Sequence, residues 1–508
     1  MRTQAYPAGP SRPGRGAAGG PRPGVPENLK GSKFKPPAWG LLGILFTHTW
    51  CTHACRKGKK RSMGPLLQLA GTRLHIGIDD TDSIKGMCTT YLGFRLARLL
   101  QKEGAEFEDY PRLVRLNPNV PWKTRGNGAV GMTVNVSDPE AARKIAIDAV
   151  SLYSDLENGA NPAAVFCEGG IPQPVRDLSR EALHVMVEQE RARGIIERHC
   201  SGLFYTGSGQ GMVGAAAAIG YEFGDSTLEL LSYRREENRG TPRPIWPEDV
   251  RGIQGAYPDT FNSYDEARGT SIIAPRGPDP VFYGIRGELA SSLLGASEMV
   301  RTPERLEGYM IYRSNQGTAD HLEYVIDAAD PRPYSSGTIS GVISTEPVVR
   351  EGGHVFFEIN AGGSMVPCAV YKESGMTDAA ALLRGGDKVV VGGGIRRESG
   401  SHPKVLNVEF ARVERLARIY RMANPYCTKC SKSMKSKGIG QGFKCTRCGA
   451  ASIHRVEREI PRGISVGLYL PVASSQRHLA RPYGRQGRTS RIQFDGASPW
   501  LGVFDSGE

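Results

Sequence analysis

The stretch RLHIGIDDTDSIKGMCTTYLGFRLARLL, residues 73–100, decides the fold of the first ordered part of the chain. Leu74, Ile76 and Ile78 alternate with small or polar residues, which is the pattern of a strand. Four leucines between residues 92 and 100 then recur at the spacing of one helix face. The stretch therefore predicts a strand, an acidic loop and a helix.

The acidic loop carries Asp79, Asp80 and Asp82 at the carboxyl end of the predicted strand. Carboxylate oxygens are hard ligands that hold Mg²⁺, and such an ion bridges the phosphates of a bound nucleotide. The alternative is a solvated turn without a ligand. Three acids within four residues, directly after a buried strand, favour the magnesium and nucleotide interpretation.

Thr89 and Thr90 fall where the predicted helix begins. The start of a helix exposes unpaired N–H groups and the positive end of the helix dipole, so it favours a bound phosphate or a phosphorylated threonine. The alternative is that Thr89 only caps the helix.

Charge separates the two ends of the chain from its middle. Residues 1–70 hold twelve Lys or Arg against one acid, residues 422–508 hold fourteen against five, and the middle has a net charge of −7. A polyanion partner is therefore indicated for the ends. Residues 1–70 are rich in Pro, Gly and Arg, and we expect a disordered basic extension. The apolar run at 39–50 is too short to span a bilayer, so no membrane association is expected.

Ten cysteines in 508 residues are too sparse for a disulfide scaffold, and a reducing cytoplasm is the expected compartment. Four of them form the pairs Cys427-x2-Cys430 and Cys445-x2-Cys448, separated by fourteen residues. Two such pairs bring four thiolates around one Zn²⁺ and leave no open coordination position. The predicted zinc site is therefore structural.

Basic residues with one aromatic side chain surround these cysteines, a pattern that suits a single-stranded RNA loop. The candidates for RNA contact are Lys429, Lys432, Lys435, Lys437, Phe443, Lys444 and Arg447. The alternative for Phe443 is packing in the ribbon's own small core. Residues 464–508 follow as a basic C-terminal segment, which we expect to be flexible beyond about residue 485.

Two glycine-containing segments are candidates for phosphate binding. KTRGNG at 123–128 offers Lys123, Arg125 and the backbone of Gly126 and Gly128 to a triphosphate, although a hairpin turn has the same composition. TGSGQGMVGAAAAIG at 206–220 lacks the Lys and Ser/Thr of a P-loop, and its alanines predict a helix packed closely on a sheet. The pattern changes from about residue 308 to short alternating segments with Gly-rich turns, which predict a small β-barrel or sandwich.

The acidic loop belongs to the first of a series of motifs that follow one another along the chain. They are GIDDTDSIKGMCTTYLG at 77–93, RLNPNVPWKTRGNGAV at 115–130, ENRGTPR at 237–243, DTFNSYD at 259–265, APRGPDPVFYGIRG at 274–287, RSNQGTADHL at 313–322 and the four-cysteine module. In this order they resemble the archaeal synthetases that make 2-agmatinylcytidine at the wobble position of a CAU-anticodon isoleucine tRNA. The resemblance runs from about residue 73 to about residue 480.

The resemblance implies a multidomain α+β enzyme. Its parts would be a kinase-like α/β ATP domain at 71–200, a ferredoxin-like domain at 201–307, an OB-fold barrel at 308–419, a zinc ribbon at 420–463 and the basic segment at 464–508. The implied reaction replaces the cytosine 2-oxo group by agmatine, with ATP giving AMP and phosphates. Phosphoryl transfer would make cytosine O2 a leaving group, after which the agmatine amine attacks C2.

The resemblance also implies roles for individual residues. Asp79, Asp80 and Asp82 would serve metal binding and phosphoryl transfer, and Thr89 would be autophosphorylated. Agmatine carries a guanidinium, so its pocket must present carboxylates and amide oxygens. The candidates are Asp259, Asn262 and Asp265 in DTFNSYD, and an Asx-rich surface turn is the alternative.

A second class of function is a non-catalytic protein that binds single-stranded nucleic acid through barrel and ribbon modules. Clustered carboxylates repel phosphates unless a cation intervenes, so the acidic loop favours the enzyme. A third possibility is a small-molecule kinase whose ribbon contacts proteins, and it predicts no RNA binding.

Overall fold

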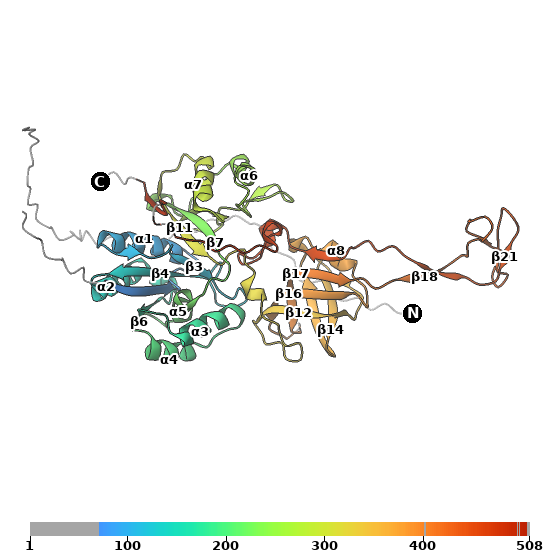
Figure 1. Ribbon diagram of the computed structural model, residues 1–508, viewed down its shortest axis with the longest axis horizontal. Coiled ribbons are helices and arrows are strands. Elements are labelled where there is room, and N and C mark those ends of the chain that lie inside the picture. Colours follow the sequence, from blue (N-terminus) through green and yellow to red (C-terminus); the bar gives the residue numbers. More distant parts are fainter. Residues whose placement is uncertain (1–70, 401–402, 495, 497, 505–508) are drawn as a thin grey trace, which may run out of the picture. The chain divides into compact units, whose positions relative to one another are not determined.

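The computed structural model describes residues 71–400, 403–494, 496 and 498–504 (Figure 1). The predicted extension at 1–70, with its apolar run, lies outside the described residues. Within the described part of the chain, no helix has the length and apolar character needed to cross a membrane.

Residues 73–100 supply an inner strand of the main sheet and the helix that follows it. β1 (Thr72–Asp79) pairs antiparallel with β4 (Gly128–Val136) and with β5 (Ala163–Glu168). α1 (Thr89–Lys102) follows the acidic loop. The predicted strand, loop and helix are confirmed, and Asp79 is the last residue of the strand.

Helices cover both faces of this part of the sheet (Figure 1). Leu74, Ile76 and Ile78 are buried in one core with residues of α1 and of α2 (Pro139–Tyr153). The opposite face packs against α5 (Met212–Gly220), the predicted alanine-rich helix, which contacts α3 (Gln173–His184) and α4 (Gln189–His199). Close packing depends on Gly77, because a Cβ there would lie 2.0 Å from the Ala215 carbonyl oxygen.

One sheet of ten strands continues through residues that the resemblance assigns to the ATP domain, the ferredoxin-like domain, the start of the barrel and the C-terminal segment. Its order is β10-β7-β11-β3-β4-β1-β5-β6, with β2 paired to β4 and β24 paired to β11. These further strands are β2 (Glu106–Phe107), β3 (Arg112–Arg115), β6 (Gly202–Tyr205), β7 (Thr227–Arg234), β10 (Val281–Gly287), β11 (Leu306–Ser314) and β24 (Leu501–Val503). The boundaries expected after residues 200 and 307 therefore do not interrupt the sheet.

Two helices and a small sheet accompany the β7 and β10 side. They are α6 (Pro247–Ala256), α7 (Ala290–Met299), and the pair β8 (Tyr264–Asp265) and β9 (Thr270–Ser271). α7 contacts both β10 and β7, and α6 packs on α7 and the small sheet.

The predicted small barrel is confirmed. Its strands are β12 (Ser336–Ile343), β14 (Val355–Ala361), β15 (Ser364–Val370), β16 (Lys388–Arg396) and β17 (Val405–Arg415). The order β12-β16-β17-β15-β14 closes because β12 also pairs with β14. β13 (Val348–Val349), β23 (Gly467–Tyr469) and α8 (Thr377–Ala381) lie against it.

The four-cysteine module consists of short strands. β18 (Tyr420–Ala423) pairs with β22 (Val456–Glu459), and β19 (Lys435–Ser436), β20 (Phe443–Lys444) and β21 (Ala451–Ser452) form a separate small sheet. Its core consists of Met434 and Phe443 with two of the cysteines.

The C-terminal segment differs from the flexible basic tail that the sequence predicted. Arg485 is only 2% exposed and donates to Asp225 and Glu288, both at 2.9 Å. Trp500 is buried in the core of the main sheet, and β24 extends that sheet. The prediction was wrong because acids far away in the sequence neutralise these arginines.

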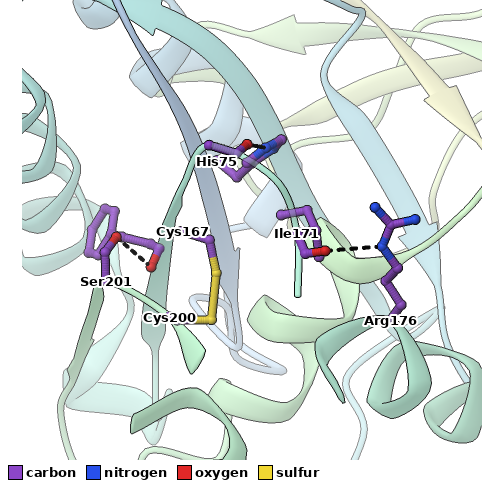
Figure 2. Close-up of a disulfide and its surroundings, with 8 residues drawn as sticks. His75, Cys167, Ile171, Arg176, Cys200 and Ser201 are labelled. Atoms are coloured by element: carbon purple, nitrogen blue, oxygen red, sulfur yellow. Dashed lines mark hydrogen bonds between the residues drawn. A yellow bond between two sulfur atoms is a disulfide. The ribbon is translucent and has the colours of Figure 1, made fainter. Parts of the chain in front are cut away.

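A disulfide joins Cys167 in β5 to Cys200, the residue after α4 (Figure 2). Next to it, the Ser201 backbone N–H donates to the Phe166 carbonyl at 2.8 Å, where β6 begins to pair with β5. One disulfide among the described residues agrees with the expectation that the chain is not a disulfide scaffold, but the sequence did not indicate this bond.

Candidate active site

The end of β1 places two of the three acids of the loop at one cavity. This cavity has a volume of 340 Å³, and Asp79, Asp80, Lys123 and Glu188 supply its charged groups. Its apolar lining is Leu116, Val120, Trp122, Val185, Met186, Val187 and Val213. We call it the Asp79 cavity. Apolar walls beside a charged end suit a ligand with an aromatic base and phosphates.

The first turn of α5 holds the Asp79 carboxylate in place. A Cβ on Gly214 would lie 1.8 Å from Asp79 Oδ2, and one on Gly211 would lie 2.4 Å from the Asp79 carbonyl oxygen. The glycine-rich segment at 206–220 therefore supports the acidic loop. A glycine-rich pattern suggests a phosphate-binding loop and does not by itself indicate this contact with Asp79.

Burial raises the pKa of all three carboxyls of the loop. Burial and the neighbouring charges of Asp80 and Asp82 raise the pKa of Asp79 well above its ordinary value. Burial and Asp82 raise the pKa of Asp80 to about 6. Burial also raises the pKa of Asp82, although the Arg125 guanidinium opposes this. A divalent cation would relieve the repulsion in this cluster.

Asp82, unlike the other two acids, binds the KTRGNG segment. Its Oδ1 accepts from Thr124 Oγ1 and its Oδ2 from Arg125, both at 3.0 Å. Arg125 also donates to the carbonyls of Ser83, Gly86 and Met87. Arg125, predicted as a phosphate ligand, is therefore engaged in closing the acidic loop.

A second cavity of 460 Å³ lies on the other side of the KTRGNG segment. Thr124 and Gly128 line both cavities, while Asp82, Thr89, Thr90, Arg125 and Gly126 line the second. We call it the Thr89 cavity. Of the four candidate ATP ligands, Lys123 and Gly128 lie at the Asp79 cavity, and Gly126 and Arg125 face the Thr89 cavity.

Thr89 is the first residue of α1, as predicted, but it does not cap the helix. The capping position belongs to Cys88, which makes no capping hydrogen bond through its side chain. Thr89 Oγ1 instead accepts a hydrogen bond of 3.1 Å from Thr81 Oγ1. Thr89 is buried, and it lines the Thr89 cavity.

The opposite wall of the Thr89 cavity consists of residues from β7 and β10 and the loop before β10. Glu229 forms ion pairs with Arg286 at 3.1 Å and Arg115 at 3.7 Å. Asp279 lies 3.8 Å from Arg125 and 3.7 Å from Arg243, yet its Oδ2 makes no hydrogen bond among the described residues. Sequence reasoning missed Glu229, while Asp279 and Arg286 lie in the motif at 274–287, to which it assigned no role.

The candidate agmatine ligands in DTFNSYD have structural partners. Asp259 accepts from the backbone of Glu288 and Leu289, at the start of α7. Asn262 donates to Gln476 at 2.9 Å, and Asp265 accepts from the Ser474 backbone at 2.9 Å. None of the three lines the Asp79 or the Thr89 cavity.

The ligand atoms of Cys427, Cys430, Cys445 and Cys448 lie within 4.8 Å of one another, as the spacing predicted. Among the described residues, these four cysteines are the group whose ligand atoms lie close enough together to hold one metal ion. The carboxylates of Asp79, Asp80 and Asp82 do not form such a group. The cations proposed for RNA contact, Lys429, Lys432, Lys435, Lys437, Lys444 and Arg447, are exposed. Phe443 is a correction: it is buried in the ribbon core, so its ring is not a surface for base stacking.

Comparison with known proteins identifies the family. The family models described as TiaS TCKD domain, TiaS FLD domain and TiaS C-terminal zinc ribbon domain match residues 75–207, 209–321 and 424–464. The isoleucine-tRNA 2-agmatinylcytidine synthetase TiaS of Archaeoglobus fulgidus is 34% identical over 425 residues, which are 83% of this chain and 100% of that protein. The chain belongs to the TiaS family. It is therefore an enzyme of the synthetase class, and its four cysteines form the zinc site of the family's ribbon domain.

Solved TiaS structures have the same fold. A complex of TiaS with its isoleucine tRNA and ATP is 33% identical, with a TM-score of 0.73 over 83% of this chain and all of that chain. A complex of TiaS with the same tRNA, AMPCPP and agmatine is 32% identical, with a TM-score of 0.71 at the same coverage.

Proposed function

We propose that this TiaS-family enzyme ligates agmatine to C2 of the wobble cytidine of a CAU-anticodon isoleucine tRNA and consumes ATP. Agmatine ligation to this tRNA rests on the family membership and on the TiaS complexes with isoleucine tRNA, nucleotide and agmatine. The two cavities suggest separate places for the nucleotide and for the group that accepts its phosphoryl group.

The Asp79 cavity is the proposed ATP site. Its apolar wall, with Trp122 and Val187, suits adenine, and Lys123 suits the phosphates. Mg²⁺ fits Asp79 and Asp80, because their oxygens are hard ligands whose repulsion a cation would relieve. When bound, the ion would neutralise phosphate charge. Asp82 acts through Arg125 and keeps the loop closed.

The Thr89 cavity is the proposed site of transfer. Thr89 Oγ, at the lining of this cavity, accepts the γ-phosphoryl group in the autophosphorylation step and leaves ADP. In activation, the β-phosphoryl group of that ADP is transferred to cytosine O2 and leaves AMP, so that the C2–O2 bond can break with phosphate as leaving group. Hydrolysis of the phosphothreonine releases the second phosphate. The agmatine amine forms the new bond to C2, and AMP and phosphates are the remaining products.

Agmatine is a dication in solution, so its site needs carboxylates or other hydrogen-bond acceptors. Asp279 Oδ2, which has no hydrogen bond within the described residues, and Glu229 are acids of the Thr89 cavity that suit a guanidinium. They replace Asp259, Asn262 and Asp265 as our candidates, since those three bind backbone or amide groups elsewhere. The exposed cations of the zinc ribbon are the proposed tRNA contacts.

The single observation that carries this proposal is the common wall: Thr124 and Gly128 separate a cavity containing Asp79 from one containing Thr89. The test is incubation with ATP, agmatine and the CAU-anticodon isoleucine tRNA transcript, followed by nucleoside mass spectrometry. We expect 2-agmatinylcytidine at the wobble position and none when agmatine or ATP is omitted. ATP consumption with unmodified tRNA would instead favour a small-molecule kinase.

A further inference from the structure

His478 reaches the Thr89 cavity from the far end of the chain. The segment after the zinc ribbon returns to the main sheet and is fixed by two backbone hydrogen bonds, from Gly317 to the His478 carbonyl at 2.9 Å and from Ala319 to the Leu479 carbonyl at 2.7 Å. Leu479 and Ala480 are buried beside it. The backbone at His478 is therefore held firmly, and the imidazole forms part of the cavity wall.

The imidazole lies against the glycine turn that separates the two cavities. A Cβ built on Gly126 would lie 3.0 Å from both Nδ1 and Cε1 of His478. Within the described residues, the ring of His478 takes part in no hydrogen bond that would commit either nitrogen. It thus offers a free nitrogen lone pair at the place where the proposed transfer occurs.

The other titratable groups of the cavity have partners or another proposed role. Cys88 Sγ is hydrogen-bonded to Thr90 Oγ1 at 3.0 Å, and the unpaired Oδ2 of Asp279 is the proposed ligand of the agmatine guanidinium. Asp82 accepts from Thr124 and Arg125, and Glu229 accepts from Arg286 and Gln316. Asp279 is the third acid, and it lies between two guanidiniums. The remaining charged side chains, Arg115, Arg125, Arg276 and Arg286, are cations that cannot accept a proton.

The surroundings keep His478 neutral. Burial, followed by the charges of Arg115, Arg286, Lys123 and Arg477, holds the pKa of His478 well below its ordinary value. Arg477 is itself anchored 3.6 Å from Glu409 on the barrel strand β17. At neutral pH the ring is therefore an acceptor and not a donor cation.

We propose that His478 is a catalytic base of the amine-transfer step, and this rests on the function proposed above. The free amine of agmatine forms the C2–N bond as the C2–O2 bond breaks and phosphate leaves. One N–H proton passes to the imidazole and then to water, so the product is the neutral substituted nitrogen. An attacking nitrogen becomes far more acidic as it bonds to C2, so a weak base suffices.

The experiment measures single-turnover formation of 2-agmatinylcytidine with saturating ATP and tRNA, for wild type, His478→Gln and His478→Ala. His199→Gln, at an exposed histidine at the end of α4, is the control. General base removal predicts a loss of about 100-fold or more in both His478 variants. Added imidazole should restore part of the rate in His478→Ala, where there is space, but not in His478→Gln.

An aminooxy analogue of agmatine separates a catalytic role from a structural one. Its adduct nitrogen is more acidic and loses its proton without help, so the two His478 variants should lose much less rate with it. Equal losses with both nucleophiles, or no rescue by imidazole, would overturn the inference while leaving the proposed function intact. A wild-type enzyme that transfers no agmatine would overturn the proposed function itself.

Discussion

At the scale of single residues, Gly214 controls the position of the Asp79 carboxylate. Gly214→Ala would place the methyl carbon 1.8 Å from Asp79 Oδ2, so the carboxylate must move. We expect turnover to fall by about 100-fold, because misplacing a catalytic group by about 1 Å has effects of this size.

The matched control for this substitution is Gly255→Ala. Gly255 is an exposed glycine in α6, and a Cβ there meets nothing within 4 Å. This change should leave turnover unaltered and stabilise the fold by up to about 1 kcal/mol, as alanine does in a helix. Equal turnover of the two variants in the nucleoside assay would show that α5 does not position Asp79.

Thr89 provides a second residue-scale test. Thr89→Ala should abolish self-labelling by ATP that carries a labelled γ-phosphate, because the proposed acceptor oxygen is removed. Thr90→Ala should retain the label, since it is the Thr90 backbone carbonyl that accepts from Tyr233 and Tyr312. The reverse pattern, read from the labelled protein on a gel, would move the phosphorylation site to Thr90.

At the scale of elements, predictability from sequence depends on whether the contacts are local. β1, the acidic loop and α1 were predicted because their periodicity and their acids lie within 30 residues of chain. The Thr89 cavity was not, because it combines Glu229, Asp279 and His478 with residues near 90 and 125. No local sequence pattern indicates that residues so far apart meet, and Asp265 likewise binds Ser474, which is 209 residues away.

Loss of zinc should unfold the zinc ribbon without affecting phosphoryl transfer from ATP to Thr89. Cys445→Ser removes one of four converging thiolates, so the ribbon should lose zinc and fold poorly, and tRNA affinity should fall. Thr89 self-labelling should continue. Thr446→Ala, at an exposed neighbouring position, is the control for zinc content and for tRNA binding. Loss of self-labelling with normal tRNA binding would contradict this division of labour.

The lysines of the same element should contribute charge alone. Lys435 and Lys437 are exposed, and no ion pair involves them within the described residues. Replacing both with alanine should weaken tRNA binding. The plot of log affinity against log salt should become less steep by about 1.4, the value for two phosphate contacts on a single strand. An unchanged slope in a filter-binding titration would place the tRNA contacts elsewhere.

At the scale of the whole molecule, the C-terminal segment connects regions that are far apart in sequence. Arg481 and Arg485 both bind Asp225, Arg485 and Arg488 both bind Glu288, and Trp500 packs in the core of the main sheet. The arginines of this segment indicated a flexible basic tail, whereas in the structure Arg481, Arg485 and Arg488 form ion pairs within the protein. The segment's course also explains how a residue beyond the ribbon, His478, enters a cavity whose other walls come from the main sheet.

Substitution of Arg485 tests whether the C-terminal segment stabilises the fold or binds RNA. Arg485→Gln should lower the free energy of unfolding by about 3 kcal/mol, because it removes one of the two arginine partners of the buried Asp225 carboxylate and of the partly buried Glu288 carboxylate. Arg491→Gln, at an exposed arginine of the same segment, should leave stability unchanged. Urea titration followed by tryptophan fluorescence measures the difference, and Trp500 lies in the affected core. If Arg485→Gln instead leaves stability intact and reduces the salt dependence of tRNA binding, then the arginine serves RNA, and the internal ion pairs do not hold the segment in place.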